Sequence, residues 1–539
     1  TYYHAAQYLL RTRDEGNTWE VVSPDLTRNQ DDKQGNGGGP YTNEAVGAEN
    51  YGTISYVAES PHESGVLYTG SDDGLVHITR DNGANWENIT PKGLQETLVN
   101  AIEVSPHDPG TVYIATTRYK FNDFTPALYK STNYGKSWEN ITTGIPQGAY
   151  TRVVREDPVR KDLLVAGTET GMYVSFNGGR KWDRLKSNLP VVPVTDLQMQ
   201  HNDIQVATQG RSFWIFDDLP LLRQYQGEAG EVRLYKPEDT MYPNWYSGMD
   251  RANPDGTHPF EGVNPSSGMV LYYELPALPD SVEVSLEILD SNGDLVRKYS
   301  SVSDPDYIAY EGAPSKAAVL SKTKGLNRFI WDLRYPMLPG APKAYIEGSF
   351  RGHRAIPGTY TLRLSHGGVR RETTAAILTN PVIPTSAEAY QDYHEFMGRA
   401  EATYTEMTHM TNRLYELQGR LKEMISHLES AQYVDVASEA KRVLKKLDTW
   451  DKVMVQRLSK AYDDVENYVN GFTAEYLTAL NHGDSGIPRI NKGTRDKIDA
   501  LNTRWSTLKA QAENLIQEDI EGLNRELYEV GVGPLYLKK

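Results

Sequence analysis

A short phrase that recurs four times in the first 182 residues limits what this chain can fold into. Each copy has Ser or Thr, then Asp or Asn two positions later, Gly after two more and Trp after three more. The copies contain Asp14, Gly16 and Trp19; Asp81, Gly83 and Trp86; Asn133, Gly135 and Trp138; and Asn177, Gly179 and Trp182. Successive tryptophans lie 67, 52 and 44 residues apart. A period of about 45 residues with several short strands is typical of a β-propeller, in which each unit forms one four-stranded blade.

The residue types of this phrase, called the box below, indicate a structural turn rather than a reaction site. Asp or Asn accepts hydrogen bonds from backbone amides of its own turn, and Gly adopts the positive φ that such a turn needs. The tryptophan is expected to pack between neighbouring blades. A ring of catalytic carboxylates is disfavoured because two of the four copies have Asn.

The strand pattern around the boxes predicts an incomplete ring. The first box follows one or two strands, and the last strand-rich unit, residues 194–223, has no box. We therefore expect one partial blade, three full blades and a terminal partial blade. Half a ring would expose long strand edges, which proteins avoid. The expected partner is a set of N-terminal propeller blades, from upstream sequence or from a separate fragment.

Longer phrases around the boxes narrow the choice among β-propeller families. Among them are "GSDDGLVHITRDNGANWENITP", "LYKSTNYGKSWENI" and "VATQGRSFWIFDDL". With the box they resemble the sortilin-like, Asp-box (BNR) repeat β-propellers of large exported bacterial proteins, which are often labelled glycosyl-hydrolase-like. The resemblance covers residues 1–360 well and the rest loosely. It implies a periplasmic, cell-surface or extracellular bacterial location.

The order of strand-like and helical patterns predicts a multidomain chain that is mainly β and ends in an α-helical bundle. We expect the C-terminal part of an Asp-box β-propeller at 1–224, a linker at 225–265, an immunoglobulin-like β-sandwich at 266–382, an antiparallel helical bundle at 386–530 and a tail at 531–539. In the sandwich, alternating apolar residues mark the strands. In the bundle, apolar residues recur at steps of three and four.

Composition excludes several classes of function. The formal net charge of −16 disfavours binding to nucleic acid, which needs a basic surface. No apolar run is long enough for a membrane span. The absence of cysteine excludes disulfides and thiolate metal sites. We expect no cofactor and no metal site.

Two insertions in the repeat offer candidate ligand-binding residues, because loops of a propeller carry function more often than its blades do. The candidates are Arg28, Tyr41, Glu49, Asn50 and Tyr51 in the first insertion, and Arg118, Tyr119, Phe121 and Phe124 in the second. Aromatic and cationic side chains suit a peptide or a sugar. Solvent-facing loops that only cover the blade ends are the alternative.

No catalytic residue can be assigned from the sequence. The chain has no HExxH, Walker or GxSxG motif, and His62 and His107 lie in repeated Ser-Pro-His turns that favour a structural role. Carboxylates available to a glycosidase would be Asp72, Asp73, Glu156, Asp157, Asp217 and Asp218, although each also fits a turn or a strand end.

Three functions stay open. The first is an exported binding or scaffold protein of the cell envelope that captures a peptide, a glycan or a partner protein. The second is an inverting glycoside hydrolase with two carboxylates across a cleft, about 6.5–9.5 Å apart. The third is a subunit of a larger envelope complex. An enzymatic role is uncertain and less favoured than binding.

Overall fold

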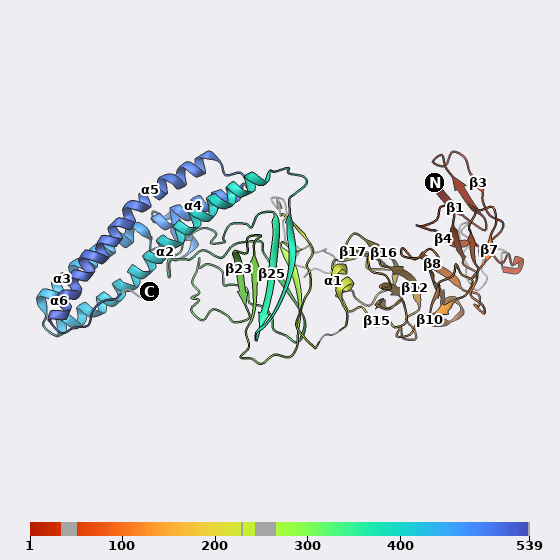
Figure 1. Ribbon diagram of the computed structural model, residues 1–539, viewed down its shortest axis with the longest axis horizontal. Coiled ribbons are helices and arrows are strands. Elements are labelled where there is room, and N and C mark those ends of the chain that lie inside the picture. The colour runs from red at the N-terminus through yellow and green to blue at the C-terminus, as the bar shows by residue number, and fades with distance from the viewer. Residues whose placement is uncertain (34–50, 228–229, 243–265, 537–539) are drawn as a thin grey trace. The chain divides into compact units, whose positions relative to one another are not determined.

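The computed structural model describes residues 1–33, 51–227, 230–242 and 266–536 (Figure 1). Contacts within the chain divide it into two compact units, Thr1–Gly227 and Glu228–Lys539. The chain is mainly β, with many small sheets followed by a C-terminal helical region. No helix among the described residues is both long enough and apolar enough to cross a membrane.

Within the described residues, the first unit has five small antiparallel sheets that follow one another along the chain. Sheet 1 contains β1 (Tyr2–Ala5), β2 (Leu9–Thr12) and β3 (Glu20–Val21). Sheet 2 contains β4 (Ile54–Glu59), β5 (Leu67–Ser71), β6 (Val76–Thr79) and β7 (Glu87–Asn88). Sheet 3 contains β8 (Leu98–Val104), β9 (Val112–Arg118), β10 (Asp123–Ser131) and β11 (Glu139–Asn140). Sheet 4 contains β12 (Thr151–Glu156), β13 (Leu164–Thr168), β14 (Gly171–Ser175) and β15 (Asp183–Arg184). Sheet 5 contains β16 (Val194–Gln200), β17 (Asp203–Thr208) and β18 (Phe213–Phe216), and the short helix α1 (Leu219–Gln224) follows it.

Each sheet is a meander because short turns join strands that are neighbours in sequence. The first strands of sheets 2 to 5, which are β4, β8, β12 and β16, contact one another in chain order. In sheets 2 and 4 the second and third strands are buried along their whole length, because neighbouring sheets cover both of their faces. This arrangement gathers the loops of successive sheets at the two ends of the first strands.

The first strands of sheets 2 to 5 share one irregularity. Their pairing with the second strand shifts by one residue near the start of each strand, which makes a β-bulge. The residues at the shift are Ser55, Asn100, Arg152 and Thr195. A bulge turns one side chain away from the regular alternation, and bulges often occur beside binding sites.

The second unit begins with two sheets that share one hydrophobic core. The smaller sheet has the strand order β19 (Arg233–Leu234), β21 (Met269–Leu275) and β24 (Gly325–Trp331). The larger sheet has the order β20 (Thr240–Met241), β26 (Val369–Leu378), β25 (Gly358–His366), β22 (Val284–Leu289) and β23 (Leu295–Ser300). The core includes the fully buried Trp331 from one sheet and Leu362 from the other. The immunoglobulin-like topology stays a prediction.

The stretch predicted as a linker, 225–265, is not wholly a connection. Its strands β19 and β20 each join a sheet of the second unit, and Tyr235 and Tyr242 beside them are buried. Pairs of two residues are too short to give a strand pattern in sequence, so tertiary packing rather than local propensity forms them.

The helical region contains α2 (Ala387–Ser430), α3 (Val434–Met454), α4 (Phe472–Ser485), α5 (Lys492–Asn514) and α6 (Glu521–Glu529). The one-turn helix η3 (Tyr462–Glu466) precedes α4, and a π-helical turn, η4 (Leu515–Ile520), joins α5 to α6. Ser386 caps α2 by accepting a hydrogen bond from Ala389 N. The helices share a core with Leu338, Ile346 and Phe350 from the connection between β24 and β25, so sheets and helices pack as one unit.

Candidate functional site

The four boxes form the same hydrogen-bonded turn, which can be followed in the first copy. The backbone N–H of Gly16 donates to Thr12 Oγ1 over 2.9 Å, and the N–H of Thr18 donates to Asp14 Oδ1 over 2.9 Å. The hydrogen bonds from Thr18 hold the pKa of Asp14 down to about 2. The equivalent glycine N–H bonds of the other copies measure 3.0, 2.9 and 3.0 Å. Each box Asp or Asn is therefore engaged by its own turn.

The box tryptophans also connect neighbouring sheets. The Nε1–H of Trp86 donates to the carbonyl of Val22 over 2.9 Å, and Val22 lies three residues after Trp19, the preceding box tryptophan. The same contact recurs as Trp138 to Ile89 O at 2.7 Å and Trp182 to Ile141 O at 2.5 Å. The later boxes therefore brace one sheet against the one before it.

Trp19 differs from the other three box tryptophans. Its Nε1–H donates to Gly16 O of its own turn over 3.1 Å. The residue is 45% exposed, whereas Trp182 is 1% exposed. No sheet among the described residues covers Trp19 as the earlier sheets cover its counterparts.

Glu96, which sequence reasoning missed, brings the two predicted loops together. Tyr51 Oη donates to Glu96 Oε1, and Lys33 Nζ lies 2.7 Å from the same oxygen. Arg118 Nη1 donates to the backbone carbonyl of Glu96, and its guanidinium lies 4.9 Å from the centre of the Phe121 ring. Through its side chain and its backbone carbonyl, Glu96 on the segment before β8 therefore joins residues 67 positions apart, Tyr51 and Arg118.

An aromatic platform lies beside this junction. Tyr119 stacks on Tyr150, with ring centres 5.6 Å apart and planes inclined by 20°, and Phe124 lies 6.0 Å from Tyr150. The guanidinium of Arg152, at the bulge of β12, is 5.4 Å from the Tyr150 ring and 2.7 Å from Glu169 Oε2. Tyr119 is 36% exposed and Phe124 42% exposed, so both present apolar faces to solvent.

Arg28, from the first predicted loop, contacts Asp73 and not the platform. The backbone N–H of Arg28 donates to Asp73 Oδ2 over 2.7 Å, and Arg28 Nε donates to Asp73 O over 2.8 Å. Arg28 therefore fixes the turn after β5. Tyr41, Glu49 and Asn50 lie outside the described residues.

Three of the six candidate catalytic carboxylates are buried and serve the fold. Asp73 is fully buried between Ser71 and Arg28. Asp157 is fully buried as well, and its Oδ2 lies 2.9 Å from Arg223 Nε. Glu156 is 3% exposed and accepts a hydrogen bond from Asp162 N over 2.9 Å. Two further candidates, between β18 and α1, are Asp217 and Asp218.

Asp72 is less buried than Asp73, Asp157 and Glu156. It is half-buried in the turn after β5, where its Oδ1 accepts hydrogen bonds from Gly52 N at 3.1 Å and Thr53 N at 2.9 Å. Burial raises the pKa of Asp72, and the neighbouring Asp73 adds to this effect. A raised pKa is what a carboxyl needs to act as a general acid.

A second polar cluster, also missed from sequence, joins the first strands of four consecutive sheets. Arg155 Nη2 lies 3.0 Å from Tyr56 Oη and 2.8 Å from Asp196 Oδ1, and Arg155 Nη1 lies 3.6 Å from Glu103 Oε2. Burial raises the pKa of Glu103 to about 7. Tyr56, Glu103 and Arg155 line a cavity of about 330 Å³ with residues of the Ser-Pro-His turns. The four residues of the cluster come from β4, β8, β12 and β16 and show no motif in sequence.

The histidines of the Ser-Pro-His turns also link adjacent sheets. His62 Nε2 lies 2.9 Å from Ser105 O, and His107 Nε2 lies 2.8 Å from Asp157 O. Each histidine thus contacts the equivalent turn of the following sheet. Among the described residues, no group of His, Cys, Asp and Glu side chains could hold a metal ion.

Comparison with known proteins gives weak matches to xyloglucanases. The chain is 26% identical over 209 residues to a probable oligoxyloglucan-reducing end-specific xyloglucanase of Neosartorya fischeri, covering 35% of this chain and 24% of that protein. It is 23% identical over 290 residues to the oligoxyloglucan-reducing end-specific xyloglucanase of Emericella nidulans, covering 48% of this chain and 34% of that protein. The matches thus span about a quarter to a third of the length of these relatives. No protein-family model matches the chain.

Solved structures give similar but distant matches. An ancestral GH74 enzyme is 14% identical and covers 57% of this chain and 37% of its own, with a TM-score of 0.28. YCF48 bound to a D1 peptide is 15% identical and covers 30% of this chain and 51% of its own, with a TM-score of 0.25. The sortilin-like, Asp-box relationship stays a prediction.

Proposed function

We propose that the first unit binds a glycan chain on the platform of Tyr119, Phe124 and Tyr150, as part of an exported carbohydrate-active protein with a β-propeller. The partly exposed rings of Tyr119 and Phe124, which pack on the buried Tyr150, carry this proposal. Sugar rings present C–H faces that are attracted to the negative face of an aromatic ring. Arg152 and Glu169 at the platform edge offer hydrogen-bond donors and acceptors to hydroxyl groups. The similarity to xyloglucanases favours a β-glucan with side branches as the ligand.

Binding can be measured by titration calorimetry with xyloglucan oligosaccharides, and with linear cello-oligosaccharides for comparison. We expect Tyr119→Ala to weaken binding about tenfold, because one stacked aromatic pair contributes about 0.5–1.5 kcal/mol beyond the area that it buries. Tyr2→Ala is the matched control, since Tyr2 is 63% exposed on β1 and away from the platform. Equal affinities for both variants, or binding of peptides in place of glycans, would contradict the proposal.

Hydrolysis of the glycan is the second candidate, and Asp72 is the observation that favours it. We propose Asp72 as general acid because its pKa is raised and because it lies in the turn that holds Gly52 and Thr53, beside Tyr51. The partner base is not assigned. The test is release of reducing sugar from xyloglucan by the wild type and by Asp72→Asn. Undiminished release by the variant would exclude Asp72, whereas binding without any release would leave the platform as a binding face.

We further propose that another box-bearing sheet covers Trp19. The template is the contact made three times within the unit, in which the tryptophan donates to the residue three positions after the preceding box tryptophan. The partner sheet would therefore place such a carbonyl at Trp19 Nε1. Trp19 fluorescence should become resistant to acrylamide quenching when that sheet is supplied by a longer chain. Quenching that stays as strong as in the 539-residue chain would contradict this pairing.

A further inference from the structure

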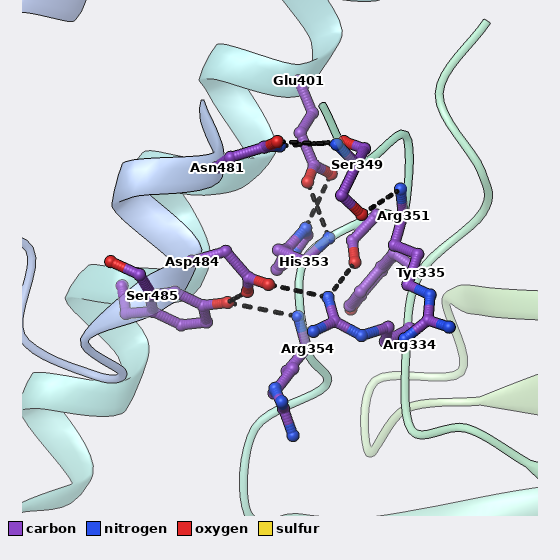
Figure 2. A network of polar contacts seen from close by, with 12 residues as sticks. Arg334, Tyr335, Ser349, Arg351, His353, Arg354, Glu401, Asn481, Asp484 and Ser485 are labelled. Carbon is purple, nitrogen blue, oxygen red and sulfur yellow. Dashed lines mark hydrogen bonds and ion pairs between the residues drawn. The ribbon is translucent and has the colours of Figure 1, made fainter. Parts of the chain in front are cut away.

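The second unit contains a polar junction between its sheets and its helices (Figure 2). The connection from β24 to β25 lies against α2 and α4 there. Arg334 Nη1 is 2.8 Å from Asp484 Oδ2, and Tyr393 Oη donates to Asp484 Oδ1 over 2.6 Å. Ser349 and Asn481 exchange two hydrogen bonds of 2.7 and 2.8 Å. These contacts contain no histidine.

A histidine pair forms the other half of this junction. His353, on the same connection, is 2% exposed, and its backbone N–H donates to Glu401 Oε1 over 2.6 Å. Its ring Nδ1 lies 2.8 Å from Glu401 Oε2, and its Nε2 lies 2.9 Å from His394 Nδ1. Tyr335 stacks on the His353 ring, with centres 4.2 Å apart and planes inclined by 8°. Glu401 and His394 both belong to α2.

The hydrogen-bond partners determine which nitrogen carries a proton. The Glu401 carboxylate has only lone pairs, so His353 Nδ1 must donate to it. In the neutral pair His353 Nε2 is then an acceptor, and His394 Nδ1 donates. After one proton is added, His353 can donate from both nitrogens if His394 carries its hydrogen on Nε2. After a second proton is added, both nitrogens that face each other across 2.9 Å carry hydrogen, and the bond cannot form.

We propose that the Glu401–His353–His394 chain is an acid-released clasp that holds the sheet connection against helix α2. The pair keeps its hydrogen bond with no added proton or with one, and loses it with two. Acidification from neutral pH therefore acts on the histidine half of this junction, while the Arg334–Asp484 and Ser349–Asn481 contacts persist. Release frees the segment around His353 from α2 without unfolding either core.

The charged groups around the pair set the direction of the effect. Burial lowers the pKa of His394, and the neighbouring His353 lowers it further, whereas Asp290 of the β22–β23 turn and Glu395 of α2 act in the opposite direction. Arg334 on the same connection is neutralised by Asp484 of α4. In the unfolded chain each histidine takes up a proton near pH 6.5. The unfolded state therefore binds more protons than the folded one below that pH, and the junction weakens as the pH falls.

Amide hydrogen exchange of the full chain tests the clasp. Peptides that contain residues 349–356 should lose protection between pH 7.5 and pH 5, after correction for the intrinsic exchange rates, because the folded pair holds the pKa of His394 below its value in the unfolded chain. Peptides from β13 serve as the internal reference. In His394→Asn the amide nitrogen lies close to the place of imidazole Nδ1 and can donate to His353, but it does not titrate. This variant should lose most of the pH dependence.

Two controls separate the clasp from general acid destabilisation. His409→Asn removes an exposed histidine from the same helix and should behave as the wild type. Asp484→Asn weakens the other half of the junction and should lower protection by the same factor at both pH values. Histidine C2–H exchange, followed by mass spectrometry, reports the titration of each ring in the wild type. Independent titration of both rings near pH 6.5, or undiminished acid sensitivity in His394→Asn, would overturn the proposal.

Discussion

The first box and the three later boxes have the same internal turn but different surroundings. In all four the box glycine N–H donates to the Ser or Thr hydroxyl over 2.9–3.0 Å. The later tryptophans donate to the preceding sheet, whereas Trp19 donates to its own turn and is 45% exposed. The turn is therefore locally self-sufficient, and the stabilisation between sheets depends on a neighbour. Replacing the box tryptophan should therefore cost little stability where no neighbouring sheet covers it.

The largest expected difference concerns the tryptophans themselves. Trp182→Ala should lower the free energy of unfolding of the first unit by about 3–5 kcal/mol, the range for large-to-small changes in a core. Trp182 is 1% exposed, and its indole is bound to Ile141 O of the preceding sheet. Trp19→Ala should cost less than about 1 kcal/mol, since most exposed substitutions cost little. Urea unfolding followed by circular dichroism measures the free energy of unfolding of both variants. Equal losses would contradict the difference between the covered Trp182 and the exposed Trp19.

The glycines should show the next largest difference. A Cβ on Gly83 would lie 2.5 Å from Val22 O, whereas a Cβ on Gly16 would meet nothing closer than the Trp19 ring at 3.9 Å. Both glycines have positive φ, +96° and +93°, so both substitutions carry backbone strain. We expect Gly16→Ala to cost about 1–2 kcal/mol through strain alone. Gly83→Ala should cost about 1–3 kcal/mol more through overpacking. Chemical denaturation of the two variants side by side tests this, and equal costs would show that Val22 moves away.

Sequence predicts the box turn better than it predicts the contacts that this turn makes with a neighbouring sheet. The box turn depends on residues within seven positions of one another, from Thr12 to Trp19, so its role follows from residue types alone. Its tryptophan contact depends on Val22 and Trp86, 64 residues apart, which only the order of the sheets brings together. Tandem sheets and a helical region could be predicted from the repeat and from apolar periodicity.

The candidate site was also predictable only where its residues follow a local pattern in the sequence. Tyr119 and Phe124 could be found because two aromatic residues stand in an insertion of the repeat. Tyr150 and Glu96 could not, because each lies in an ordinary connection and acquires its role through contacts with another loop. Arg155 and Tyr56 are 99 residues apart in sequence. The fold was therefore more predictable than the site, since periodicity is local and convergence of side chains is not.

A change inside the turn should have the same effect in covered and uncovered boxes. Thr12 and Thr79 are both buried, and each accepts the box glycine N–H. Replacing either with Val keeps the shape and leaves that N–H without its acceptor, which should cost about 1–3 kcal/mol. Thermal unfolding of Thr12→Val and Thr79→Val therefore tests whether the turn contributes equally to stability in the uncovered and the covered box. A much smaller cost for Thr12→Val would mean that the first turn itself is less ordered, and Trp19 would then differ for that reason alone.

The smallest expected effect concerns Asp14, which is fully exposed, and it appears only in acid. Hydrogen bonds from Thr18 hold the pKa of Asp14 at about 2, below the ordinary value of about 3.9 for an unfolded chain. The stability that this carboxylate contributes is present above pH 3.9 and is lost as the pH falls toward 2. Asn133 makes the equivalent turn without a charge, since its Oδ1 accepts Ser137 N and its Nδ2 donates to Ser137 Oγ. Asp14→Asn should therefore match the wild type at pH 7 and lose less stability between pH 4 and pH 2, as thermal melts across that range would show. A variant that is already weaker at pH 7 would mean that the charge itself, and not the hydrogen-bond geometry shared with Asn133, holds the first turn together.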